Sequence, residues 1–236
     1  MPPPIFAARD APAGILAVVS ERGATPSGTP SPTAFLARDF VRELGYPDLP
    51  LVRATQVHGG RVVTIEERPA PGETVDAGEC DALVTRLAGV GLVVQTADCV
   101  PVLLAASDAI GAVHAGWRGA AANVAGSAAE AFRRSTEDPE SVRAWLGPSI
   151  GACCYEVGGE VAAQFSGDFV RATCDGRYRL DLPSIVRAQL EAAGIPNVAS
   201  GAPCTMCGGE RYASYRRDRE RAGRMIALVA RMTRSG

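Results

Sequence analysis

Short apolar stretches bounded by turn residues recur along the chain. They occupy residues 14–20, 51–57, 62–65, 82–85, 90–95, 100–105 and 110–114, and Gly, Pro, Asp or Asn separates them. Runs of this length are typical of buried strands. We expect the six stretches between residues 51 and 114 to form a central sheet. Two further strands are expected at residues 142–146 and 225–229.

Helical spacing of apolar residues predicts four helices. The first covers residues 32–44, with Ser31 as its N-cap and Pro32 at the first helical position. The second covers residues 118–134, where many alanines allow one long helix to pack closely. The remaining two span residues 158–165 and 182–193.

Residues 21–32 are rich in Gly, Pro, Ser and Thr without periodicity, so we expect a mobile loop there. The sequence shows no internal repeat and no linker. Because 236 residues lie at the upper end of what one hydrophobic core organises, we expect a single domain over residues 1–236.

Composition and charge narrow the possible partners. The chain is 47% hydrophobic and 21% charged, which is ordinary for a soluble protein. Its formal net charge is −2 and no run of Arg exceeds two residues, so we expect no nucleic-acid partner. The apolar runs are too short to cross a bilayer, and no export signal is recognised. We therefore expect a cytoplasmic protein, a monomer or weak homo-oligomer, that acts on a small molecule.

Seven cysteines in a chain without an export signal indicate thiols or metal ligands rather than disulfides. Histidine is scarcer, since His58 and His114 are the only two in the sequence. His58 is followed by two glycines and His114 by Ala115 and Gly116, and Cys99 lies in a polar break between two apolar stretches. Two imidazoles and one thiolate are the ligand set of many catalytic zinc sites. The spacing alone equally allows two separately hydrogen-bonded histidines and a buried cysteine.

The motifs around these residues closely resemble the YfiH-type laccase-domain family, from about Arg53 to Arg224. The resemblance also rests on four further motifs, DALVT, GPSIG, CCYEV and SYRRD, at residues 81–85, 147–151, 153–157 and 214–218. The resemblance implies one zinc ion held by His58, Cys99 and His114. It also implies an α/β fold, an α/β/β/α sandwich with mixed sheets and helices on both outer sides.

Members of the family are described as purine nucleoside phosphorylases for adenosine, inosine and methylthioadenosine that also deaminate adenosine. Others are described as peptidoglycan-editing amidases that remove L-serine from UDP-MurNAc-L-Ser. The resemblance therefore implies a zinc-dependent transferase and hydrolase for purine nucleosides and phosphate, with the amidase as the alternative. Copper is less suitable than zinc, because a multicopper centre needs on the order of ten histidines.

Several polar residues near these motifs are candidates for substrate binding. Trp117 would stack on a purine and Arg118 would hold phosphate, although a half-buried aromatic and a helix-start cation look the same in sequence. Asp81 is a candidate general acid or hydrogen-bond partner of a histidine ligand. The other candidate substrate-binding residues are Arg53, Gln56, Ser149, Arg216 and Arg217.

Two other interpretations remain open. A metal-independent hydrolase would use Cys99 as nucleophile and one of the two histidines as base. A binding module would use the metal only to hold the fold. Cys204 and Cys207 match half of the zinc-deaminase signature, but the His-x-Glu half is missing. We expect these two cysteines to be structural or at the edge of the site, with a redox or second-metal role as the alternative.

Overall fold

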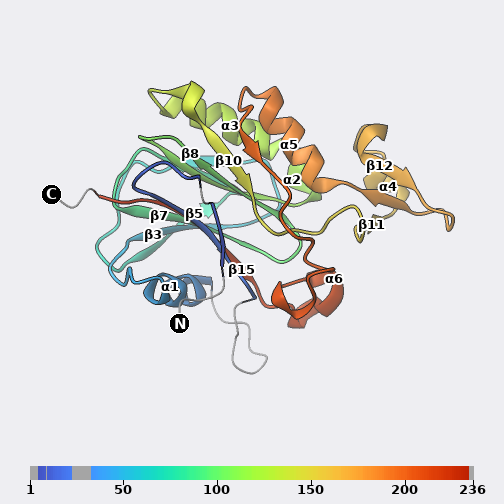
Figure 1. The fold of residues 1–236 in the computed structure, drawn as a ribbon, viewed down its shortest axis with the longest axis horizontal. Helices are drawn as coiled ribbons and strands as arrows, with labels where there is room; N and C mark the ends of the chain where they lie inside the picture. The colour runs from blue at the N-terminus through green and yellow to red at the C-terminus, as the bar shows by residue number, and fades with distance from the viewer. Residues whose placement is uncertain (1–4, 9, 23–32, 234–236) are drawn as a thin grey trace.

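The computed structural model describes residues 5–8, 10–22 and 33–233. Figure 1 shows two stacked sheets with helices α3 and α5 over one outer side and α1 on the other. This is the α/β/β/α sandwich that the resemblance implies. All but the first two residues of the expected loop 21–32 lie outside the described residues, as do the expected cap Ser31 and Pro32.

The first sheet combines strands from both ends of the chain. In spatial order it consists of β1 (Ile5–Ala7), β2 (Ile15–Ser20), β15 (Met225–Arg231), β7 (Val90–Thr96), β3 (Leu51–Thr55) and β5 (Thr74–Glu79). Strand β15 pairs antiparallel with β2 and β7, whereas β3 pairs parallel with β7 and β5. The sheet is therefore mixed, as expected.

The second sheet is also mixed. In spatial order it consists of β14 (Val198–Ala199), β10 (Arg143–Leu146), β8 (Val100–Ala105), β9 (Ile110–Ala115), β6 (Ala82–Thr85) and β4 (Val62–Thr64). The pairs β14–β10 and β4–β6 are parallel, and the central pairs are antiparallel. A small third sheet consists of β11 (Glu156–Val157), β13 (Tyr178–Leu180) and β12 (Val170–Ala172).

The expectation of one central sheet from residues 51 to 114 is wrong, because those strands divide between the two layers. Strand β8 shows the physical reason. Leu103 and Ala105 face the core between the sheets, while Val102 and Leu104 face the core under the helices. A strand covered on both faces is a continuous apolar run, and such a run does not indicate which layer it joins.

The expected long helix over residues 118–134 is also wrong. It is divided into α2 (Trp117–Ala121) and α3 (Val124–Ser135), and Asn123 between them has a φ angle of 57°. Asparagine adopts this left-handed conformation more readily than most residues, and that conformation ends α2. Alanine-rich periodicity continues across the break, so the pattern did not reveal it.

The other helices follow the sequence more closely. Helix α1 (Thr33–Glu43) packs Phe40 and Val41 on the outer face of the first sheet. Helix α5 (Leu182–Ala192) matches its expected range, and α4 (Gly159–Ala162) is shorter than expected. The short elements are α6 (Tyr215–Asp218), η2 (Pro139–Ser141), η3 (Gly167–Phe169), η4 (Gly209–Arg211) and η5 (Arg219–Arg221). None of the described helices has the length and apolar character needed to cross a membrane.

Phe132 provides a test of the packing between α3 and the second sheet. Its side chain is fully buried, and a Cβ atom added to Gly111 of β9 would lie 3.0 Å from the Phe132 ring. Replacing Phe132 by alanine should lower the free energy of unfolding by about 3–5 kcal/mol, because the lost contacts leave a cavity. Urea unfolding measures this change. Glu130→Ala, at an exposed position of the same helix, should change it by less than about 0.5 kcal/mol.

Candidate active site

The three expected metal ligands come together where the two sheets meet. His58 follows β3 of the first sheet, Cys99 lies in the turn between β7 and β8, and His114 lies in β9 of the second sheet. Their ligand atoms all lie within 4.8 Å of one another. The two imidazole rings are edge to face, with centroids 4.8 Å apart. His58 and Cys99 are 41 positions apart in the sequence, and Cys99 and His114 are 15 positions apart. The three side chains nevertheless form one group.

Asp81, at the start of β6, fixes both histidines. Its carboxylate is fully buried and lies 2.8 Å from Nδ1 of His114. It also accepts the backbone N–H groups of Val57, His58 and Gly59, at 3.3, 3.0 and 2.7 Å. The contact with Nδ1 leaves Nε2 of His114 available to a metal, which is the arrangement that orients histidine ligands. Asp81 therefore acts through the histidines rather than on a substrate.

The backbone around the group adopts conformations that ordinary residues avoid. His58 has a φ angle of 61° and Asp98, next to Cys99, has one of 85°. Such left-handed conformations cost about 1–3 kcal/mol each and persist where the surroundings determine them. Asp81 supplies the restraint at His58. At Asp98, Thr205 Oγ1 and the Arg216 backbone N–H each donate to the carboxylate at 2.6 Å.

Gly116 completes the close packing of the group. A Cβ atom at this position would lie 3.0 Å from both Cys99 Sγ and His58 Cδ2. Any larger residue would push the sulfur and the imidazole away from their places. The glycine two positions after His114 is therefore required by the site itself.

Charge is separated within the group. Burial alone would raise the pKa of the Cys99 thiol, but hydrogen bonds from His114 and His58 lower it to about 6. Burial alone would lower the pKa of His114, but its hydrogen bonds to Asp81 and Cys99 raise it to about 9. Without metal, the group is thus a thiolate beside an imidazolium at neutral pH.

The donor set fits zinc. A thiolate and two imidazoles, one oriented by a buried carboxylate, match the ligand chemistry of catalytic zinc sites with three protein ligands. Copper oxidase chemistry needs far more imidazole than the two histidines of this chain can supply. His58, Cys99 and His114 would hold the ion.

A cavity of about 700 Å³ opens beside the group. Its volume lies within the range of small-molecule sites, which is about 300–1,000 Å³. Five guanidinium groups give it a strongly positive lining. They belong to Arg53, Arg118, Arg216, Arg219 and Arg224. Such a lining favours an anionic or phosphate-bearing ligand.

The structure brings five of the seven expected substrate-binding residues to this cavity. Trp117 and Arg118 line it together, with the guanidinium 4.5 Å from the indole centroid. Arg53 pairs with Asp76 at 2.6 Å. Gln56 also lines the cavity, and its amide exchanges two hydrogen bonds of 2.8 Å with the backbone of Gln95. Arg216, the fifth, donates to the carbonyl of Glu156 at 2.7 Å.

Ser149 and Arg217 do not line the cavity. Ser149 is buried, and its backbone pairs with Pro203 and Thr205 of a neighbouring loop. Arg217 pairs with Asp218 at 2.8 Å and donates to the carbonyl oxygens of Thr205, Gly209 and Tyr212. These contacts hold the loop after β14 in place, so both residues support the wall of the cavity from behind.

The cavity lining also includes residues that were not expected from the sequence, among them Arg219, Arg224, Tyr155 and Asp98. Tyr155 lines the cavity, and burial together with the charge of Cys99 raises the pKa of its hydroxyl to about 12. It stays protonated and able to donate a hydrogen bond. Asp98 also lines the cavity, although its carboxylate oxygens are both occupied. Tyr155 belongs to the CCYEV motif and Asp98 directly precedes Cys99, but a sequence motif does not show which of its side chains point inward.

Comparisons with known proteins identify relatives of the chain. A family model described as multi-copper polyphenol oxidoreductase laccase matches residues 34–232. The chain is similar to a Xylella fastidiosa protein named purine nucleoside phosphorylase, at 41% identity over 80% of this chain and 75% of the relative. It is also similar to purine nucleoside phosphorylase YfiH of Escherichia coli, at 35% identity over 74% of this chain and 71% of the relative.

Two further comparisons extend the likeness. A protein named adenosine deaminase RL5, from an unknown prokaryotic organism, is 36% identical over 77% of this chain and 75% of its own. The crystal structure of YlmD from Geobacillus stearothermophilus superposes with a TM-score of 0.80 at 28% identity. It covers 98% of this chain and all of its own.

The contacts of Asp81 predict its effect on metal binding. Asp81→Asn should weaken zinc binding about 10- to 100-fold, because an amide no longer fixes His114 as a carboxylate does. Competition with a chromophoric chelator measures the affinity. Glu79→Gln, at an exposed position two residues earlier, serves as the control. Equal zinc affinities in both variants would contradict the role of Asp81.

The charge separation predicts unusual reactivity of Cys99 in metal-free protein. Alkylation by iodoacetamide should show a half-point near pH 6 rather than near the ordinary thiol value of about 8.5, because the thiolate is the reactive form. Peptide mass spectrometry after timed alkylation measures the rate at this cysteine. Zinc should suppress the reaction. An ordinary half-point, or a rate that zinc does not change, would contradict the assignment of Cys99.

Proposed function

Because the chain belongs to the laccase-domain family of YfiH and YlmD, we propose that it is a zinc-dependent purine nucleoside phosphorylase. It cleaves adenosine, inosine or methylthioadenosine with phosphate and releases the free base. It also deaminates adenosine. The relatives named purine nucleoside phosphorylase and adenosine deaminase support both activities. The resident metal is zinc, and the enzyme works on these small molecules in the cytoplasm, where its thiols stay reduced.

One observation carries the proposal: the His58, Cys99 and His114 group lies in the wall of a cavity lined by five arginines. A nucleoside and a phosphate ion together fit about 700 Å³. Guanidinium groups bind phosphate oxygens in pairs. A purely hydrophobic substrate would leave this charge without a partner.

The residues divide into those that bind the base and those that bind phosphate. Trp117 offers a flat surface on which a purine stacks, and Arg118 lies against that indole. Arg216 and Arg224 provide positive charge elsewhere in the lining. Tyr155 keeps its proton and donates it in a hydrogen bond to a substrate oxygen or ring nitrogen.

Bound zinc would supply a Lewis acid that polarises an oxygen of phosphate or water. The protein keeps the group ready for this task. Asp81 accepts a hydrogen bond from Nδ1–H of His114, so Nε2 is the nitrogen that would bind the ion. The low pKa of Cys99 provides a thiolate at neutral pH, the form that binds metal.

Two other functions compete with this proposal. A cysteine hydrolase is favoured by one specific observation, the thiolate of Cys99 beside the imidazolium of His114 in metal-free protein. The peptidoglycan-editing amidase is favoured by the same positive cavity, since its nucleotide-linked substrate is also anionic. The metal requirement distinguishes the phosphorylase from the cysteine hydrolase, and the preferred substrate distinguishes it from the amidase.

The test is base release from inosine and adenosine by zinc-loaded protein, followed by liquid chromatography. We expect hypoxanthine and adenine to appear only with phosphate, and inosine to form slowly from adenosine. Cys99→Ala should lower kcat by at least about 100-fold, because two remaining ligands hold zinc poorly. Trp117→Ala should mainly raise KM, because it removes the stacking surface.

Cys174→Ser provides the control, since Cys174 is exposed and does not line the cavity. Undiminished turnover after complete zinc removal would favour the cysteine hydrolase. A specificity constant for UDP-MurNAc-L-Ser far above that for inosine, in the same preparation, would favour the amidase. Either result overturns the phosphorylase.

A further inference from the structure

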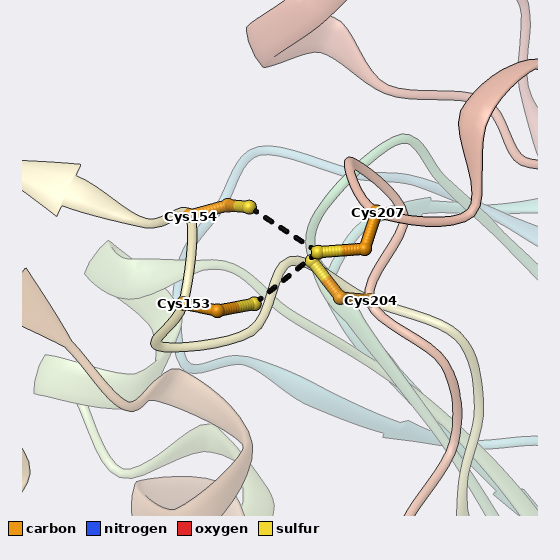
Figure 2. A group of neighbouring side chains, drawn as sticks. All are labelled: Cys153, Cys154, Cys204 and Cys207. Atoms are coloured by element: carbon orange, nitrogen blue, oxygen red, sulfur yellow. Dashed lines mark hydrogen bonds between the residues drawn. The ribbon is translucent and has the colours of Figure 1, made fainter.

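A second group of ligand atoms lies apart from the His58, Cys99 and His114 group. Cys153 and Cys154 lie in the loop between β10 and β11, and Cys204 and Cys207 lie in the loop after β14. Figure 2 shows the four side chains pointing toward one another from the two loops. Their Sγ atoms all lie within 4.8 Å of one another. We call these residues the four-cysteine group.

The spacing of the sulfur atoms suits a shared ion better than a disulfide. Cys207 Sγ lies 3.5 Å from both Cys153 Sγ and Cys154 Sγ. A zinc ion with bonds of about 2.3 Å to four sulfurs requires separations of roughly 3.8 Å. A disulfide bond of about 2.05 Å joins one sulfur to only one other. The equal distances from Cys207 to two partners therefore match the edges of a tetrahedron.

The backbone stabilises the anionic form of Cys204. The Gly151 N–H donates to Cys204 Sγ at 3.3 Å. A backbone N–H that donates to a sulfur favours its thiolate, the form that binds metal.

The surroundings also suit the charge of a loaded site. Zinc with four thiolates carries a net charge of −2, and a nearby cation offsets it. Arg179 donates to the Cys153 carbonyl at 3.2 Å, which places its guanidinium beside the group, where it also pairs with Glu156 at 3.6 Å. Four cysteine ligands leave no open position, as in structural zinc sites.

We propose that Cys153, Cys154, Cys204 and Cys207 bind a second zinc ion in a closed, structural site. The ion joins a loop that lines the cavity to a loop that supports the cavity wall. Tyr155 follows Cys154 directly and lines the cavity, and Thr205 follows Cys204 and donates to Asp98. The second ion thus fixes the wall of the site from outside, whatever reaction the site performs.

The experiment uses cobalt as a probe in the full-length Cys99→Ala variant, which retains both loops and all four cysteines. We expect one Co²⁺ per chain, with the intense visible bands of a tetrahedral thiolate site. Adding Cys153→Ser and Cys207→Ser to this variant should abolish those bands. Adding Cys174→Ser, at an exposed cysteine outside the group, should leave them unchanged.

Metal content provides the second measurement and does not depend on activity. Zinc-reconstituted wild-type protein should contain two zinc ions per chain, and Cys99→Ala should retain one. Absence of thiolate bands in cobalt-loaded Cys99→Ala would overturn the proposal. So would a disulfide within the group in protein purified with reductant, or iron with inorganic sulfide bound there.

Discussion

The carboxylate of Asp81 is the contact on which the candidate active site depends. One side chain accepts the Nδ1 proton of His114 and three consecutive N–H groups of the loop that carries His58. Burial alone would raise its pKa, but the hydrogen bonds from His114 and the Gly59 N–H keep the pKa below its usual value. The charge therefore survives in the interior because every lone pair has a donor. The Asp81 carboxylate thereby connects the loop after β3 of the first sheet, where His58 has a left-handed conformation, to strand β9 of the second sheet.

The two-layer fold explains why such a contact is needed. His58 follows a strand of the first sheet, whereas His114 and Asp81 belong to the second. Apolar packing sets the orientation of the two sheets but does not position individual polar side chains, so directional hydrogen bonds place His58 relative to His114. Asp98 performs a similar task on the other side of Cys99, where Thr205 and Arg216 restrain its strained backbone.

The sequence predicted elements better than their arrangement. Strands β6 to β10 and helix α5 lie near their expected ranges, because apolar runs and helix-end residues are local signals. Helix α3 begins at a break that only the φ angle of Asn123 reveals. The three candidate metal ligands, which the structure brings together, could be proposed because histidine is scarce and each motif lies at the end of an apolar run. The sequence pattern could not test the expected contact of Arg217 with substrate. An arginine on the surface and an arginine that donates to backbone carbonyls of a loop look alike in sequence.

The four-cysteine group shows most clearly that a sequence does not reveal which distant segments meet in the fold. Two adjacent cysteines and a Cys-x-x-Cys turn, about 50 positions apart, carry no joint signal in one sequence, because their meeting depends on strand order. The coordination chemistry also separates the two groups of ligands. Three ligands beside a cavity leave a position for a reactant, whereas four cysteines around one point leave none. The group beside the cavity thus combines both histidines of the chain with one cysteine, whereas the other group consists of cysteines alone.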